Sequence, residues 1–320
     1  MRKYCFSTEV VDLDNQAPNR NKRESKYFWD ELNHLMCAGG FHSIEVPYEP
    51  KWDFGGRSGI PRTKRSVTVK FGTVAEYMKF LKENGIDSID CVHMNTSLFC
   101  QGVLPMYFGA SEHFASEAAE FAAEAGCRTV VLSATPPYFS VKKILGDESE
   151  ESFLEKTKQL VEKLAGKVSS AGGVFCLKNE YWGLLRGEKI TSFLDSINAD
   201  VKLDLDTAHL RIAGADIEKI INDNAGRIGI VHLTDTSFED TDETWKTALP
   251  EFPANRATKV ITDPGEGSID LKAVVNLLDK AGYDGPLVFN PKNSYDISRS
   301  ILRTRYFIDT QIECPGKVGE

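Results

Sequence analysis

Residues 128–133 read RTVVLS and residues 172–177 read GGVFCL, and each contains a short apolar run typical of a buried strand. Between them lies a stripe with the i, i+4, i+7, i+8, i+11 spacing of an amphipathic helix, formed by Phe153, Thr157, Leu160, Val161 and Leu164. The glycine pair at 172–173 is typical of a helix end directly before a strand. This stretch therefore predicts a strand, a helix and a second strand.

The same rhythm of apolar run, polar loop and helical stripe recurs about eight times along the chain. The predicted strands are Lys3–Thr8, His42–Val46, Ser88–His93, Arg128–Ser133, Val174–Leu177, Val201–Leu205, Ile228–His232 and Pro286–Asn290. They are mostly apolar on both faces, as parallel strands covered by helices must be. Strict alternation predicts an α/β protein with a parallel sheet, and eight units favour a closed barrel.

An open, doubly wound sheet is the alternative, but it should carry GxGxxG after the first strand, where this chain reads Ser7-Thr8-Glu9-Val10. We therefore predict a single (β/α)8 TIM barrel over residues 1–320, with a C-terminal tail over residues 308–320.

Two connections are too long for simple turns, namely residues 47–66 after the second strand and residues 236–267 after the seventh. Their aromatic and arginine residues include Trp52, Phe54, Arg57, Arg62, Trp245, Phe252 and Arg256. In a barrel both loops project over the catalytic face as lids or substrate walls. A subunit contact is the other interpretation, because aromatic residues and arginine are also enriched at interfaces. A homo-oligomer or a hetero-oligomer therefore stays open.

The composition excludes some classes of partner. The 320 residues carry a formal net charge of −9, so the chain has no basic footprint for nucleic acid. No run approaches the roughly 18 apolar residues that a membrane helix needs. The seven cysteines form no CxxC pair, and several lie in apolar runs. They are typical of reduced thiols in an intracellular protein, so we expect a cytoplasmic location.

Polar residues gather at the predicted C-terminal ends of the strands. In chain order they are Glu9, Glu45, His93, Ser133, Lys178 with Glu180, Asp206 with His209, His232 with Asp235, and Asn290 with Lys292. A single buried histidine or aspartate is as often structural as catalytic. In a parallel barrel, however, these ends share one rim, and so many polar ends together indicate an active site.

Several strings resemble signatures of the xylose-isomerase-like barrels, a superfamily that includes sugar phosphate isomerases and epimerases, inosose dehydratase and the endonuclease IV type of repair enzyme. Residues 205–209 (LDTAH) resemble the family's Asp-Thr-Gly-His string, and residues 230–235 (IVHLTD) its strand seven. Residues 265–270 (GEGSID) resemble its entry into the following helix, residues 282–286 (GYDGP) its turn into strand eight, and Ile44-Glu45 its strand two. The match follows the right order over nearly the whole chain.

The resemblance implies a divalent cation held by a strand-five Glu, a strand-six Asp, a strand-seven His and a strand-eight Glu. These positions fall on Lys178, Asp206, His232 and Asn290, so two ligands are kept and two are replaced. The family's four ligands carry a formal charge of about −3, whereas these four residues sum to about zero, which disfavours metal binding. If Glu180 rather than Lys178 points inward, a Mn, Mg or Zn site made of Glu180, Asp206 and His232 stays open.

The resemblance also implies proton abstraction next to the carbonyl of a sugar or keto-sugar. The enzyme classes are isomerase, epimerase or lyase, the last of the dehydratase or C-glycoside deglycosidase type. The candidate catalytic residues are Lys178, Asp206, His209, His232, Glu45 and His93. The candidate substrate-binding residues are Glu180, Trp182, Trp52, Asp235 and Asn290.

Lys178 has two interpretations. As an ammonium it would stabilise an enolate in place of the metal. With a pKa lowered by burial it would act as a base or form a Schiff base. The histidines are the natural proton carriers, because imidazole titrates near neutral pH.

Two other functions compete with an enzyme acting on a carbohydrate. A non-catalytic sugar-binding or regulatory barrel would explain the replaced ligands, since fold does not determine function. A repair nuclease would need further histidines and a basic groove, and both Ser133 at the end of strand four and the acidic net charge oppose it.

Overall fold

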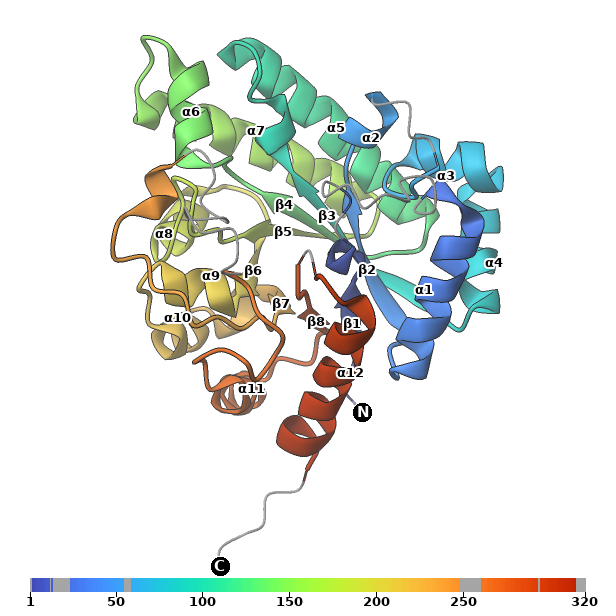
Figure 1. Ribbon diagram of the computed structural model, residues 1–320. Coiled ribbons are helices and arrows are strands. Elements are labelled where there is room, and N and C mark those ends of the chain that lie inside the picture. Colours follow the sequence, from blue (N-terminus) through green and yellow to red (C-terminus); the bar gives the residue numbers. More distant parts are fainter. Residues whose placement is uncertain are drawn as a thin grey trace, which may run out of the picture.

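In the computed structural model the chain forms a closed barrel of eight parallel strands that pair in sequence order, with helices around the outside (Figure 1). The structure describes residues 2–11, 13, 24–54, 59–247, 260–292 and 294–314, and the side chain of Phe54 is outside this description. The predicted TIM barrel is therefore confirmed.

The strands are β1 (Tyr4–Ser7), β2 (Ser43–Tyr48), β3 (Ser88–Asn95), β4 (Thr129–Ser133), β5 (Val174–Lys178), β6 (Lys202–Asp206), β7 (Ile228–His232) and β8 (Leu287–Phe289). All eight predicted strands are present, each displaced by at most two residues at either end. The apolar runs predicted them well because their outer faces pack on helices and their inner faces on one another.

The larger helices are α1 (Lys26–Ala38), α2 (Lys51–Phe54), α3 (Lys64–Phe71), α4 (Val74–Glu83), α5 (Leu104–Glu124), α6 (Tyr138–Leu145), α7 (Glu150–Ser170), α8 (Lys189–Ser196), α9 (Thr207–Ile212), α10 (Ile217–Asp223), α11 (Leu271–Lys280) and α12 (Ile297–Phe307). Short turns are η1 (Thr8–Val10), η3 (Thr96–Phe99), η4 (Ala225–Arg227), η5 (Thr244–Lys246) and η6 (Ile308–Ile312). Polar side chains cap many of them: Thr63 and Ser66 form a capping box at α3.

The inside of the barrel is layered. An apolar layer is formed by Cys5, Cys91, Val131, Cys176, Ile230 and Val288. Because side chains alternate along a strand, the residue two positions further points into the barrel again. Those next residues are Ser7, His93, Ser133, Lys178, His232 and Asn290. The apolar layer thus carries a polar layer directly above it, at the C-terminal ends of the strands, which we call the rim.

The long connection after β2 is anchored by a buried arginine, and the one after β7 packs against α6 through an aromatic contact. Arg62, only 1% exposed, donates to the backbone oxygen of Thr8 and to the Glu49 carboxylate, which ties the loop after β2 to η1. In the loop after β7, Trp245 packs edge-on against Tyr138. Of the residues expected in these loops, Arg57, Phe252 and Arg256 lie outside the described residues.

The expected tail begins with ordered structure. Ile308–Ile312 continues directly from α12 as a π-helical turn, and Ile308 is fully buried in the core. Residues 315–320 lie outside the described residues. Among the helices that the structure describes, none is both long and apolar enough to cross a membrane.

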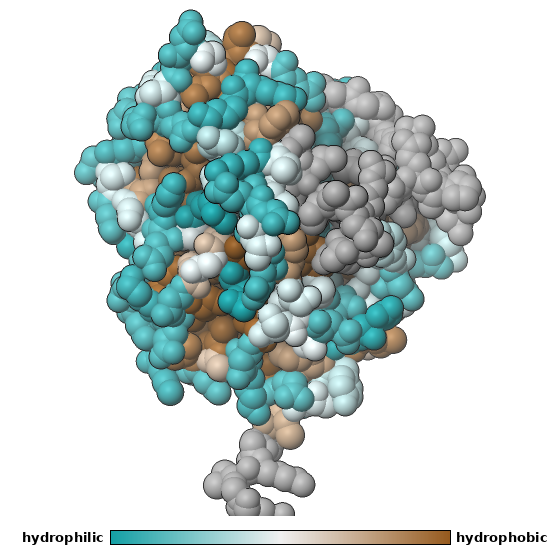
Figure 2. Space-filling model, turned by 60° about the vertical axis from the view of Figure 1, so that its left-hand side comes forward, coloured by the Kyte–Doolittle hydropathy of each residue, from teal (hydrophilic) through white to brown (hydrophobic). Residues whose placement is uncertain are grey.

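The outer surface is mainly polar. Figure 2 shows hydrophilic residues over most of the described part of one face, with apolar patches between them. This distribution is expected for helices that turn an apolar stripe toward a barrel.

Gly229 lies at a closely packed point of the barrel wall, so a substitution there probes the packing. It lies at the irregularity between β6 and β7, where a Cβ atom would come within 2.6 Å of both Cys176 Sγ and Lys202 Cβ. We expect Gly229→Ala to lower the free energy of unfolding by about 1–3 kcal/mol, because the core has no room for the methyl group. Gly226→Ala is the matched control, since a Cβ atom there meets nothing within 4 Å. Urea titrations of both variants check this, and equal effects would contradict it.

Candidate active site

The rim gathers charged side chains from strands far apart in the sequence. Glu45, His93, Lys178, Asp206 and His232 each have at most 5% of their surface exposed. A chain of ion pairs and hydrogen bonds joins four of them through a further residue, Asp204. The structure thus brings together the six predicted catalytic residues, because His209 lies beside Asp206 and the ring centroid of His93 lies 6.3 Å from that of His232.

His232 bridges two carboxylates. Its Nδ1 lies 2.7 Å from Asp204 Oδ1 and its Nε2 lies 2.6 Å from Glu45 Oε2. Both carboxylates require a proton on the nitrogen that faces them. Burial by itself lowers the pKa of His232, but Asp204 and Glu45 raise it to about 10, even against Lys178. The ring is therefore an imidazolium, and the proton-carrier role expected for His232 does not fit this geometry.

Lys178 is held as an ammonium. Its Nζ lies 3.0 Å from Asp206 Oδ2 and 3.8 Å from Asp204 Oδ2. Burial lowers the pKa of Lys178, but the carboxylates of Asp206, Asp204 and Glu45 raise it above its ordinary value. In turn, burial raises the pKa of Asp206 while Lys178 holds it well below its usual range. The interpretation of Lys178 as a neutral base or Schiff-base nucleophile was wrong, because the paired carboxylates outweigh burial.

Asp204 was missed in the sequence. It lies inside the predicted strand Val201–Leu205, one of the runs described as mostly apolar, and it is fully buried. The signal was the alternation Leu203-Asp204-Leu205-Asp206, which places both aspartates on the inner face of β6. Glu9, which the sequence placed at the first strand end but not among the chosen site residues, lies in η1 beside Asn290.

His93 carries a free lone pair. Its Nε2 lies 2.9 Å from Ser133 Oγ, and that hydroxyl donates its hydrogen to Glu180 Oε1. The hydroxyl must therefore accept from His93, so the imidazole proton is on Nε2. Nδ1 is left without a proton, buried, and with no hydrogen-bond partner among the described residues. Burial lowers the pKa of His93 to about 4, so the ring is neutral at pH 7.

His209 offers a hydrogen-bond donor, whereas His93 offers an acceptor. Its Nδ1 accepts from the backbone N–H of Tyr181 at 3.1 Å, so its proton is on Nε2. That nitrogen lies 4.0 Å from Asp206 Oδ2. Burial lowers the pKa of His209 to about 3 despite Asp206. Near neutral pH the Nε2–H of His209 can therefore donate a hydrogen bond. The lone pair on Nδ1 is already used by the backbone N–H of Tyr181.

Three of the predicted substrate-binding residues lie at the rim. Trp182 Nε1 donates to Glu180 Oε2 at 3.1 Å, which fixes both side chains beside Ser133. Asn290 donates to Glu9 Oε2 at 2.6 Å, with Lys292 Nζ 3.8 Å from the other oxygen.

The other two have structural contacts. Trp52 belongs to the main core and donates to Glu49 at 3.0 Å. The carboxylate of Asp235 accepts from four backbone N–H groups, and these hold the segment after β7; the four belong to Thr236, Gly265, Gly267 and Ile269. Neither geometry is that of a group directed at a substrate.

The four positions at which the resemblance implies a metal form a network of ion pairs and hydrogen bonds. Lys178 pairs with Asp206, both ring nitrogens of His232 face carboxylates, and the Asn290 amide donates to Glu9. An ammonium directed at Asp206 opposes a cation there, so these residues do not fit the metal. The alternative set of Glu180, Asp206 and His232 does not fit either, because His232 has no nitrogen lone pair to offer.

The charge state of His232 predicts the pH dependence of stability. Its pKa is about 10 in the folded state and about 6.5 when unfolded. Its stabilising effect is complete below about pH 6.5 and is lost as pH rises toward 10. We expect unfolding free energies between pH 6.5 and 8 to fall by up to about 1.4 kcal/mol per pH unit. His232→Gln should remove this slope, and the exposed His113→Gln should keep it. Equal slopes in all three proteins would contradict the assignment.

The comparisons agree with the fold and the order of the motifs. The model of the xylose isomerase-like TIM barrel family matches residues 38–305. A curated relative, inosose dehydratase from Geobacillus thermodenitrificans, is 26% identical over 206 residues, which are 59% of this chain and 66% of the relative. That match spans slightly less than two thirds of the relative's own length.

Two solved structures show the same fold at low identity. The structure of L-ribulose 3-epimerase aligns with a TM-score of 0.69 and 16% identity, covering 98% of this chain and 95% of the other. The IOLI protein, described with a bound zinc atom, aligns with a TM-score of 0.64 and 16% identity, covering 96% and 97% of the two chains. With its closed barrel and a family model matched over most of its length, the chain belongs to the xylose isomerase-like TIM barrels.

Proposed function

We propose that this protein is an enzyme that acts on a small carbohydrate, as an isomerase, epimerase or lyase, by taking a proton from the carbon next to a carbonyl group. We further propose that it works without a metal at the position that the family uses, with the Lys178 ammonium in its place. The observation that carries this proposal is the ion pair of Lys178 and Asp206 at the C-terminal ends of β5 and β6, with 3.0 Å between Nζ and Oδ2.

The relatives support the reaction class. The curated relatives are named inosose dehydratases, and one structural neighbour is named L-ribulose 3-epimerase. Elimination of water beside a ketone and inversion at the carbon next to a ketone share a first step, which removes a proton and places negative charge on the carbonyl oxygen. A site for either reaction needs a cation or a hydrogen-bond donor at that oxygen.

Lys178 meets this need physically. It is buried, its charge is held by Asp206 and Asp204, and it requires no movement at the moment of reaction. An ammonium has three N–H donors, and the two aspartates account for at most two of them. The third is available to a substrate oxygen, where a preorganised positive charge stabilises the developing enolate.

Proton acceptors and donors lie on different parts of the rim. Nδ1 of His93 and the carboxylate of Glu9 offer lone pairs, and in this proposal one of them accepts the proton. The ammonium of Lys292 can give a proton to a leaving hydroxyl in an elimination, and the Nε2–H of neutral His209 can donate a hydrogen bond to that oxygen. The substrate proposed here is therefore a polyhydroxylated ketone that lies between the two groups.

A class-independent assay tests the proposal. In D2O, any enzyme of these three classes exchanges the proton next to the carbonyl for deuterium, which proton NMR detects. We expect one member of a panel of inososes and ketohexoses to exchange, and Lys178→Met to lower kcat about 100- to 1000-fold. Added Mn2+ should not restore the activity of Lys178→Met.

Two further variants make the result decisive. Lys202→Met is the control, because Lys202 lies at the opposite end of β6, is partly exposed and pairs with Asp200. Lys178→Arg keeps the buried positive charge and separates misfolding from loss of chemistry, with folding checked by thermal unfolding. Ligand binding without exchange in the wild-type protein would favour the non-catalytic barrel, and full activity in Lys178→Met would exclude the assigned role.

A further inference from the structure

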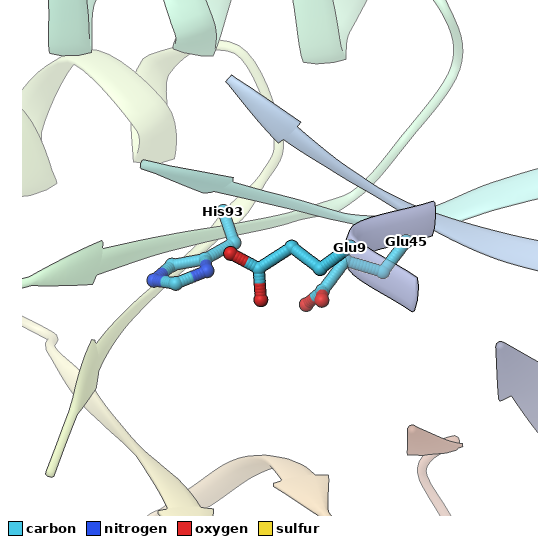
Figure 3. A group of neighbouring side chains, drawn as sticks. All are labelled: Glu9, Glu45 and His93. Atoms are coloured by element: carbon cyan, nitrogen blue, oxygen red, sulfur yellow. The ribbon is translucent and has the colours of Figure 1, made fainter. Parts of the chain in front are cut away.

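We propose that the carboxylates of Glu9 and Glu45 and Nδ1 of His93 form a binding site for a divalent transition-metal ion. One ligand atom from each of the three residues lies within 4.8 Å of the others. Figure 3 shows the imidazole edge of His93 directed at the Glu9 carboxylate, with the Glu45 carboxylate beside it. We call these three residues the acceptor cluster, because each offers lone pairs.

The unpartnered nitrogen of His93 is the independent observation. Glu180 and Ser133 fix the imidazole proton on Nε2, so Nδ1 is a bare lone pair that is buried with no partner among the described residues. An unsatisfied buried nitrogen costs free energy unless a donor or a cation meets it. The groups nearest this lone pair in the cluster are carboxylates, which cannot donate when ionised. A cation satisfies all three residues at once.

Neighbouring groups orient the ligands. Ser7 donates to Glu45 Oε1 at 2.6 Å, and Asn290 donates to Glu9 Oε2 at 2.6 Å. Hydrogen bonds of this kind hold metal-ligating carboxylates and histidines in place. The Glu9 side chain is 13% exposed, so an ion can reach the cluster from solvent. Two carboxylates and one neutral imidazole suit Mn2+ or Zn2+, with the remaining coordination positions left for water.

The site is separate from the position that the family uses. The acceptor cluster comes from η1, β2 and β3, whereas Lys178 and Asp206 lie on β5 and β6. A bound ion would occupy the lone pairs of His93 and Glu9 that the proposed function uses as proton acceptors. A binding measurement needs no substrate, so it tests the metal site separately from the proposed function. Lys292, 3.8 Å from Glu9 Oε1, is a cation that competes with the metal.

Binding of Mn2+ to the full-length, chelator-treated protein tests the proposal. We expect calorimetry to show one Mn2+ per chain, and pulsed electron paramagnetic resonance to show coupling to one imidazole nitrogen. His93→Gln should remove the nitrogen coupling, and Glu9→Gln should weaken binding by about tenfold or more. Lys292→Gln should tighten binding, because it removes the competing charge.

His113→Gln is the matched control, since His113 is exposed on α5 and should leave both signals unchanged. Thermal unfolding shows whether each variant is folded. If His93→Gln does not fold, Glu9→Gln still tests the site, because it keeps the size of the side chain. The proposal is overturned if the wild-type protein binds no Mn2+, or if binding survives in both Glu9→Gln and His93→Gln. Binding that depends on Glu180 and Asp206 instead would overturn it as well.

Discussion

The His232 imidazolium between Asp204 and Glu45 is the interaction on which the rest of the rim depends. It joins β7 to its neighbour β6 and, across the barrel, to β2, through two short contacts of 2.7 and 2.6 Å. All three groups are completely buried. Removing any one charge would leave an uncompensated ion in a setting of low dielectric constant, which is far more costly than the pair is stabilising. The charge states of the neighbours follow from this arrangement.

The contacts of each neighbouring residue determine which of its nitrogen atoms carry protons. With Asp204 shared between His232 and Lys178, the ammonium of Lys178 is stabilised from two sides and remains charged. His209 keeps its proton on Nε2 because a backbone N–H occupies Nδ1, while His93 keeps its proton on Nε2 because Ser133 must give its own to Glu180. Three histidines that are equivalent in the sequence thus become an imidazolium, a donor and an acceptor.

Much of the fold and the location of the site could be predicted from the sequence. The strand bounds, the closed barrel and the ring of polar residues follow from local patterns, since the apolar runs and their two-residue alternation persist from strand to strand. Asp204 could have been found by the same alternation. The sequence could not distinguish Trp52 and Asp235 from substrate-binding residues. Trp52 bonds to Glu49 in a loop, and Asp235 bonds to backbone groups of residues 265–269, and neither contact follows a local pattern.

The sequence alone determined the barrel, the rim and the replacement of two metal ligands by Lys178 and Asn290, because these depend on residue type and on position within a strand. Only the tertiary structure decided what the charges do. Burial would lower the pKa of Lys178 and His232, while carboxylates from other strands raise it. Which of these opposing effects prevails depends on distances of 3 to 4 Å between residues that are far apart in the chain, and only the folded barrel sets those distances.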